Sequence, residues 1–284
     1  MMKTLLDILL VHLPKVQLSH SYKTNEYQLI QNISDSYIQS SDLKKQGKGF
    51  IQSELFGDIF LPYKEMGAIN TLHLFGLDEL IIFSYYLINK GRYNKVADIG
   101  ANIGLHSILL SKCGYQVTAY EPDPKHIITL TENLNHNNID SVSVEQAAIS
   151  DRRGSASFTR VLGNTTSSHL TGDKKPYGKI EVFEVALLDI RNIMKQHDFI
   201  KMDVEGHEAQ IIEATTNEDW TTTEMILEIG SAETAKRIFN HSINININIF
   251  SQKKGWDLAR NLDDLPVSYK EGSVFLTKKK MRWE

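Results

Sequence analysis

The chain has 284 residues, of which 41% are hydrophobic and 23% are charged, and its formal net charge is −4 at pH 7. This composition excludes fibrous, disordered and disulfide-rich proteins, and the length suits one large α/β domain with an accessory segment or two small domains. The acidic balance disfavours nucleic acid as a partner, and the single Cys113 cannot form an internal disulfide, which favours the reducing cytoplasm.

The N-terminal region has mixed patterning, and we interpret residues 1–69 as an accessory or cap segment in front of a domain over residues 70–284. No run approaches the roughly 18 apolar residues of a transmembrane helix, so no membrane span is expected. The apolar run 5–13 is interrupted by Asp7 and His12, and no small-residue cleavage site follows it. We therefore predict an amphipathic helix that packs on the body or on another subunit, which would make a homo-oligomer.

Two further stretches of this segment have simple patterns. Residues 34–49 are polar and contain Lys44, Lys45 and Lys48, which predicts a solvated surface. Residues 56–61 alternate weakly before Pro62, which predicts an edge strand.

Short apolar runs then alternate with helical patterns. Helices are expected at residues 77–88, at 103–113 and from Pro124 onward, the last with Asp123 as its N-cap. Strands are expected at residues 96–99, 116–120, 142–146, 155–161, 181–186, 199–202, 225–229, 256–261 and 273–277. This succession predicts an α/β fold with a sheet of about seven strands, mostly parallel, with helices on both faces and an antiparallel hairpin at one edge.

One segment fits two interpretations. Isoleucine alternates with asparagine over residues 243–249, which taken alone indicates a strand. A parallel sheet nevertheless needs a covering crossover between residues 229 and 256, and residues 235–239 begin as a helix does. We predict a helix through this region.

The first expected strand ends in a glycine loop that contains Asp98, Gly100, Asn102 and Gly104. The glycines allow a sharp turn and a close approach of the backbone to a ligand. Asn102 stands where the dinucleotide fingerprint GxGxxG has its second glycine, so a pyrophosphate on the helix N-terminus is disfavoured. Asp98 would suit a cationic amino group on the ligand.

An acidic residue, Glu121, ends the second expected strand, 21 residues after Gly100. A carboxylate there can accept hydrogen bonds from both hydroxyls of a ribose. Alone it would equally be a carboxylate favoured by a helix N-terminus. Together with the glycine loop it indicates a nucleoside ligand.

These features resemble the FkbM family of S-adenosylmethionine-dependent methyltransferases. The resemblance rests on residues 98–104, Glu121-Pro122 and residues 201–208 (KMDVEGHE), with residues 227–229 as a weaker fourth block. It covers about residues 70–280. It implies a class I, Rossmann-like methyltransferase fold and S-adenosyl-L-methionine as the cofactor. The residues then expected to bind the donor are Asp98, Gly100, Ala101, Asn102, Gly104, His106, Glu121, Pro122, Gln146 and Ala147.

Methyl transfer to oxygen requires alignment of donor and acceptor and removal of a proton. Asp203, Glu205 and His207 follow the strand 199–202 and are the expected catalytic residues. Asp203 is the strongest candidate, because a carboxylate at the end of a buried strand needs a partner or a function. Glu208 is expected to be solvated. A divalent ion on Asp203 and Glu205 is an alternative, but no metal site is expected.

The sequence therefore predicts an O-methyltransferase that acts on a small-molecule hydroxyl, with a sugar of a surface glycan or a nucleotide-linked sugar as the first choice. The polar stretch 164–169 suits a loop that closes over this acceptor. A natural-product hydroxyl is the next choice, and an RNA ribose is disfavoured by the charge. The rival functions are a non-catalytic nucleoside-binding scaffold and an NAD-dependent oxidoreductase.

Overall fold

A computed structural model describes residues 4–41, 43, 49–66, 69–164, 168–173, 175 and 178–283 of the chain. Its main sheet has eight strands in the order β13-β12-β14-β11-β10-β3-β4-β5. They are β3 (Lys95–Ile99), β4 (Gln116–Tyr120), β5 (Ser143–Glu145), β10 (Phe199–Met202), β11 (Glu224–Glu228), β12 (Asn248–Ser251), β13 (Asp257–Leu258) and β14 (Ser273–Thr277). The strands from β11 to β5 are parallel, and β14, β12 and β13 form an antiparallel edge. The predicted α/β sheet is confirmed, with one strand more than expected.

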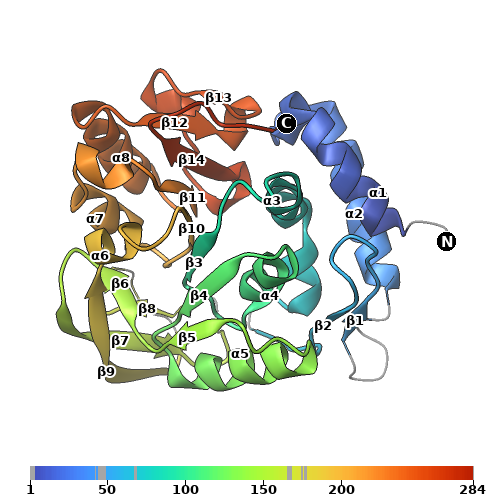
Figure 1. Cartoon of the computed structure of the whole chain (residues 1–284), viewed down its shortest axis with the longest axis horizontal. Coiled ribbons are helices and arrows are strands. Elements are labelled where there is room, and N and C mark those ends of the chain that lie inside the picture. Colours follow the sequence, from blue (N-terminus) through green and yellow to red (C-terminus); the bar gives the residue numbers. More distant parts are fainter. Residues whose placement is uncertain are drawn as a thin grey trace.

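Helices cover both faces of this sheet (Figure 1). They are α1 (Leu5–His12), α2 (Asn25–Ser40), α3 (Leu77–Ile88), α4 (Leu105–Lys112), α5 (Pro124–His136), α6 (Ile190–Met194), α7 (Glu208–Glu213) and α8 (Ala232–Asn244). Short 3-10 helices are Leu13–Lys15, Gln17–His20, Thr71–Phe75, Asn217–Trp220, Gln252–Lys254, Leu262–Asp264 and Tyr269–Glu271. One apolar core packs the helices from α1 through α5 against one face of the sheet. A second core packs α6, α7 and α8 against the other face.

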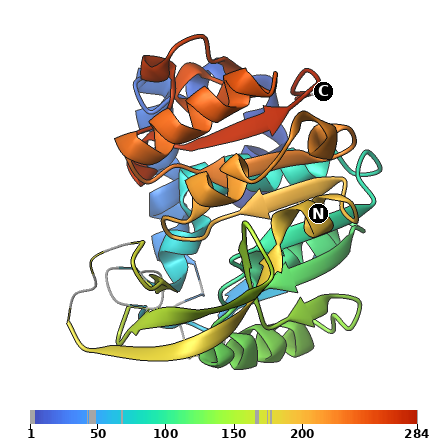
Figure 2. The same ribbon diagram turned by 90° about the vertical axis from the view of Figure 1, so that its left-hand side faces the viewer.

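The strands expected at residues 155–161 and 181–186 are present, but they lie in a second sheet and not in the main one. The second sheet has the order β6-β9-β7-β8, with β6 (Ala148–Ser150), β7 (Gly154–Val161), β8 (His169–Leu170) and β9 (Ile180–Asp189). The long β7–β9 ribbon projects from the body in the view of Figure 2. The expected edge strand at residues 56–61 is reduced to β2 (Ile59–Phe60), which pairs with β1 (Phe50–Ile51).

Two expectations near the C-terminus are corrected. The helix predicted through residues 243–249 ends at Asn244, Asn246 adopts φ +54°, and β12 begins at Asn248. Left-handed backbone stops a helix, so only the second half of the isoleucine repeat enters the sheet. The expected hairpin of residues 256–261 and 273–277 is also different, because β13 and β14 both pair with β12 and not with each other.

The N-terminal segment packs on the main sheet as part of the same core. Leu6 and Leu10 of α1 are buried in the core that also holds Phe199 of β10. His20 is fully buried, with Nε2 2.9 Å from the Leu13 carbonyl oxygen and Nδ1 accepting from Trp256 Nε1 at 2.9 Å. This segment therefore shares the core of the sheet, while its boundary at residue 69 stays a prediction.

The polar stretch 34–49 is only partly a solvated surface. Ser34 and Ile38 of α2 are buried, whereas Lys44, Lys45 and Lys48 lie outside the described residues. Within the described part of the chain, none of the helices has the length and apolar character needed to span a bilayer.

Candidate functional site

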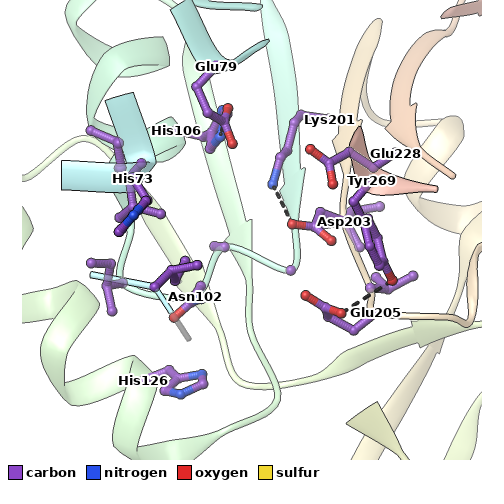
Figure 3. Close-up of a pocket in the computed structure, with 18 of the residues that line it drawn as sticks. His73, Glu79, Asn102, His106, His126, Lys201, Asp203, Glu205, Glu228 and Tyr269 are labelled. Atoms are coloured by element: carbon purple, nitrogen blue, oxygen red, sulfur yellow. Dashed lines mark hydrogen bonds and ion pairs between the residues drawn. The ribbon is translucent and has the colours of Figure 1, made fainter. Parts of the chain in front are cut away.

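A cavity of about 1030 Å³ lies at the carboxyl ends of β3, β4, β10 and β11. Side chains that follow parallel strands converge at this edge of a sheet. Figure 3 shows Asn102, Asp203, Glu205 and Glu228 arranged around this space. The loops that the sequence singled out after β3, β4 and β10 therefore meet in one place.

The glycine loop is held against the end of β10. Gly100 has φ +77°, and a Cβ atom built on it would lie 1.8 Å from the carbonyl oxygen of Asp203. The nitrogen of Asp203 in turn donates to the carbonyl oxygen of Ile99 at 2.9 Å. Only glycine allows this approach, which brings the loop and Asp203 together along the cavity wall.

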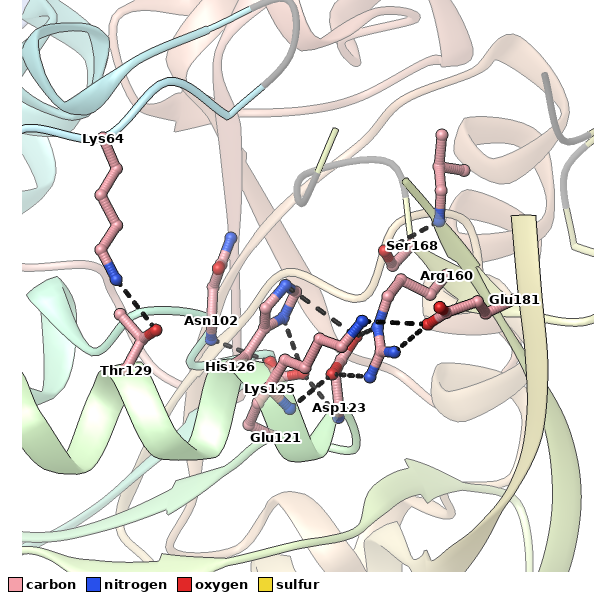
Figure 4. Close-up of polar contacts among 11 residues, drawn as sticks. Lys64, Asn102, Glu121, Asp123, Lys125, His126, Thr129, Arg160, Ser168 and Glu181 are labelled. Atoms are coloured by element: carbon pink, nitrogen blue, oxygen red, sulfur yellow. Dashed lines mark hydrogen bonds and ion pairs between the residues drawn. The ribbon is translucent and has the colours of Figure 1, made fainter. Parts of the chain in front are cut away.

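Glu121 reaches the same cavity from the end of β4 (Figure 4). Its Oε2 accepts from the nitrogen of Asn102 and its Oε1 from the nitrogen of Asp123, both at 2.9 Å. A carboxylate offers about four acceptor positions, and with His126 beside Oε1 one of them, on Oε2, stays open to a ligand. His126 Nδ1 lies 3.2 Å from Glu121 Oε1; burial lowers the pKa of His126, but the contact with Glu121 outweighs it and the pKa is raised.

A buried ion pair fixes the loop that carries Glu121 (Figure 4). Arg160 of β7 donates through Nε to Asp123 Oδ2 at 2.6 Å and forms a second bond with Asp123 Oδ1. It also contacts Glu181 of β9, and Asp123 is the N-cap of α5. The second sheet is thereby tied to the start of α5, directly beside Glu121.

Below the cavity floor lies a buried charged pair. Asp98 is fully buried, accepts from Ser107 Oγ at 2.6 Å and lies 3.9 Å from Lys201 Nζ. Lys201 lines the cavity and is also 3.9 Å from Asp203 Oδ2. Burial lowers the pKa of Lys201, but Asp203 and Asp98 raise it above its usual value, so the lysine is cationic.

Two helix starts add a contact between a histidine and a carboxylate to the wall. His106 Nε2 of α4 lies 3.1 Å from Glu79 Oε2 of α3, and its Nδ1 lies 2.9 Å from the hydroxyl of Tyr86. Burial acts to raise the pKa of Glu79, but His106 lowers it below its usual value. Opposite them, burial and the charge of Asp203 raise the pKa of Glu228 well above its usual value.

Glu205 and Tyr269 form the rim beside Asp203 (Figure 3). Glu205 has φ +57°, and its Oε2 lies 3.4 Å from the hydroxyl of Tyr269. The ring of Tyr269 rests on Gly230, where a Cβ would lie 2.3 Å from Cζ. Burial raises the pKa of Tyr269, so the phenol is neutral.

His207 also lines the cavity, but both of its ring nitrogens are engaged. Nε2 lies 2.9 Å from Ser150 Oγ, and Nδ1 lies 3.0 Å from Asp173 Oδ2.

The expectation of a solvated Glu208 is wrong. This residue is 1% exposed, and its Oε1 accepts from the nitrogen of Gly206 at 3.0 Å, because the tight turn leaves that donor without a backbone partner.

The donor residues expected from the sequence divide into two groups. Those that line the cavity are Gly100, Ala101, Asn102, His106, Glu121, Pro122 and Ala147. Asp98 lies below the floor, Gly104 packs against Leu130, and Gln146 is exposed and outside the lining. Of the pair Gln146 and Ala147 expected after β5, Ala147 lines the cavity and Gln146 does not.

Sequence reasoning missed Glu79, Lys201, Glu228 and Tyr269 as lining residues. Lys201 and Glu228 stood inside the motif blocks, and the available signal was a charged residue within a buried strand. Glu79 and Tyr269 come from distant parts of the chain, and no local pattern marks them.

The N-terminal segment and the residues 70–74 that follow it supply a further wall. Lining residues from α2 are Tyr27, Gln31, Asp35, Ile38 and Gln39, and those that follow are Ile69, Asn70, Leu72, His73 and Leu74.

Of the polar stretch 164–169, Ser168 lines the cavity, and residues 165–167 lie outside the described part of the chain. No group of three or more His, Cys, Asp or Glu side chains among the described residues is arranged to hold a metal ion.

Comparisons with known proteins bear on this site. The sequence profile described as the Methyltransferase FkbM domain matches residues 98–250. A curated relative, Methyltransferase 1 of Beauveria bassiana (strain ARSEF 2860), is 25% identical over 172 residues, which cover 50% of this chain and 69% of the relative.

Two solved structures also align with the chain. The SAM-dependent methyltransferase of Agrobacterium tumefaciens is 10% identical, with a TM-score of 0.41 over 86% of this chain and 80% of that one. The SAH-bound methyltransferase of Podospora anserina is 10% identical, with a TM-score of 0.39 over 70% of this chain and 78% of that one.

Proposed function

The chain belongs to the FkbM methyltransferase domain family, and from this we propose that it transfers the methyl group of S-adenosyl-L-methionine to a hydroxyl of a sugar. The observation that carries the donor assignment is the carboxylate of Glu121, which lines the cavity beside the Gly100 loop. Its two backbone donors hold it in place, and the open acceptor position on Oε2 suits a ribose hydroxyl.

The rest of the cavity fits the same donor. Pro122, Ala147 and Phe158 offer apolar surface next to Glu121 for an adenine. Glu79, close to His106, is a carboxylate available to an ammonium group. When bound, adenosylmethionine supplies an electrophilic methyl group on a sulfonium.

Asp203 is the residue that we assign to the proton. In the transfer the acceptor oxygen forms the new O–C bond and must lose its proton. Asp203 is adjacent to the Gly100 loop and lines the cavity, with Lys201 Nζ 3.9 Å from its Oδ2. Glu205 and Tyr269 at the rim then orient the acceptor, and His207 holds the loop 203–206 through Ser150 and Asp173.

The N-terminal segment, together with residues 70–74 that follow it, is proposed as the wall of the acceptor site. Gln31, Asp35, Gln39, Asn70 and His73 carry the donors and acceptors that a polyol needs, which favours a sugar of a surface glycan or a nucleotide-linked sugar. The alternative acceptor is a natural-product hydroxyl, favoured by the apolar Ile38, Ile69, Leu72 and Leu74 of the same wall. The proposed setting for either reaction is the cytoplasm.

The test combines binding and turnover. Calorimetry with adenosylmethionine, adenosylhomocysteine and NAD is expected to give binding of the first two only. Labelled adenosylmethionine is then offered with glycans, simple sugars, nucleotide-linked sugars and phenols. Label transferred to a sugar hydroxyl supports the proposal, whereas transfer to phenols alone favours the natural-product alternative. Binding of NAD, or donor binding without transfer to any acceptor, would contradict it.

A further inference from the structure

Carboxylates far outnumber cations around the cavity. Its described lining contains one lysine, Lys201, and no arginine. The acidic lining residues are Asp35, Asp78, Glu79, Glu121, Asp203, Glu205 and Glu228. Lys201 is close to both Asp98 and Asp203, at 3.9 Å from each, so its charge is already balanced inside the protein.

The lining histidines do not change this balance. Three of them face a carboxylate: His106 faces Glu79, His126 faces Glu121, and His207 faces Asp173. The fourth, His73, accepts from the nitrogen of Asn70 through Nδ1, and the charge of Asp35 acts on it from α2. Each cationic or titratable donor of the described lining therefore has an acidic neighbour.

Helix N-termini are the other usual place for a phosphate, since their free N–H groups point at the ligand. α3 carries Asp78 and Glu79 in its first turn, and α5 is capped by Asp123. α7 begins after His207 and carries Glu208 in its first turn, and the start of α4 follows Gly104 and belongs to the glycine loop of the donor site. The helix N-termini on the acceptor side therefore carry carboxylates, which repel a phosphate from their N–H groups.

The carboxylates of the described lining outnumber those that the donor can use. Adenosylmethionine has a sulfonium, an ammonium and one carboxylate, so its net charge is about +1 at neutral pH, by the usual pKa values of its groups. Asp35 lies on α2 in the N-terminal wall, and Asp78 lies on α3; neither belongs to the loops of Gly100 and Glu121 that are assigned to the donor.

We propose that the acceptor of this enzyme is free of phosphate: an uncharged or amine-bearing polyol fits the cavity, and a nucleotide-linked sugar is excluded by charge. This inference rests on the proposed function and narrows its choice of sugar. Like charges placed together in a site suppress wrong partners, so we expect kcat/KM for a phosphorylated sugar to be lower by about 100-fold or more.

The test uses sugars that differ in charge. Methyl transfer is measured with glucose, glucosamine, glucose 1-phosphate and uridine diphosphate glucose. The first two are expected to be methylated and the last two not. Equal or faster transfer to either phosphorylated sugar would overturn the inference but leave the proposed function intact.

A charge-reversed variant makes the test sharper. Asp35→Lys places a cation on the N-terminal wall, and we expect the ratio of glucose 1-phosphate to glucose turnover to rise by about tenfold, with donor affinity unchanged. Glu26→Lys is the matched control, since Glu26 lies on the same helix outside the cavity lining. An unchanged ratio in Asp35→Lys, or an equal rise in the control, would contradict the inference.

If none of these sugars is methylated, the proposed sugar function fails and the charge inference is judged by binding alone. Calorimetry of the protein saturated with adenosylhomocysteine is then carried out with pyrophosphate and with uridine diphosphate. No binding at millimolar concentrations is expected. Micromolar binding of either would overturn the exclusion of phosphate.

Discussion

Gly100 and Asp203 touch through their backbones, and a Cβ atom on Gly100 would lie 1.8 Å from the carbonyl oxygen of Asp203. This contact joins the loop assigned to the donor and the carboxylate assigned to the acceptor proton. The two functions of the site therefore depend on one glycine.

Replacing that glycine tests the contact. Gly100→Ala is expected to destabilise the protein by several kcal/mol and to abolish donor binding, since the collision adds to the cost of about 1 to 2 kcal/mol for a side chain at positive φ. Gly91→Ala is the control, because Gly91 has φ +83° and nothing within 4 Å of its built Cβ. Thermal unfolding and donor calorimetry measure both effects. Equal destabilisation by the two substitutions would show that the contact is unimportant.

Glu121 is predicted to hold the donor. Glu121→Ala removes a charge-assisted hydrogen bond to the ribose, worth roughly 1.5 to 3 kcal/mol, so the donor Kd should rise at least about tenfold. Glu145→Ala, at the exposed end of β5, is expected to leave it unchanged. Calorimetry gives both constants. Unchanged affinity in a folded Glu121→Ala protein removes this residue from the site.

His126 predicts a pH dependence of stability. Its folded-state pKa is raised by Glu121 despite burial, so its contribution to stability is complete below the unfolded pKa of about 6.5 and is lost as the pH rises through the folded value. His126→Ala should therefore destabilise the protein more at pH 5.5 than at pH 8.5, as read from urea midpoints. His136→Ala, exposed at the other end of α5, serves as the control. A larger effect at high pH would show the opposite linkage.

His207 is predicted to position the loop 203–206 and not to take the proton. Its ring nitrogens contact Ser150 and Asp173, so His207→Ala should lower acceptor turnover while the pH profile of kcat keeps its shape. The profile is measured at saturating donor. Loss of an ascending limb near pH 6.5 in this variant would instead identify the imidazole as the base.

Local patterns predicted the part of the fold that local physics determines. The strand ending at Ile99 and the helix capped by Asp123 follow from an apolar run and from capping chemistry, and both were correct to within two residues. The isoleucine repeat was misinterpreted because alternation cannot locate the point where Asn246 turns the chain out of the helix.

The residues of the candidate site also fall into two groups: those that a local pattern marks and those that it does not. Residues that follow strands in motif blocks, such as Glu121 and Asp203, were identified because strand ends converge in this fold. Glu79 and Tyr269 were not, since they reach the cavity from a helix before the first motif and from a turn near the C-terminus. Only the packing of the whole chain brings them to the site.

Asp203→Asn is the substitution that tests Asp203 as the proton acceptor, because it keeps the size of the side chain and removes the negative charge. With saturating labelled adenosylmethionine and a sugar that the wild type methylates, we predict unchanged donor affinity and a fall in methyl transfer of about 100-fold or more, the scale of general-base assistance. Near-normal transfer by this variant would contradict the assignment of Asp203 as the residue that receives the acceptor proton.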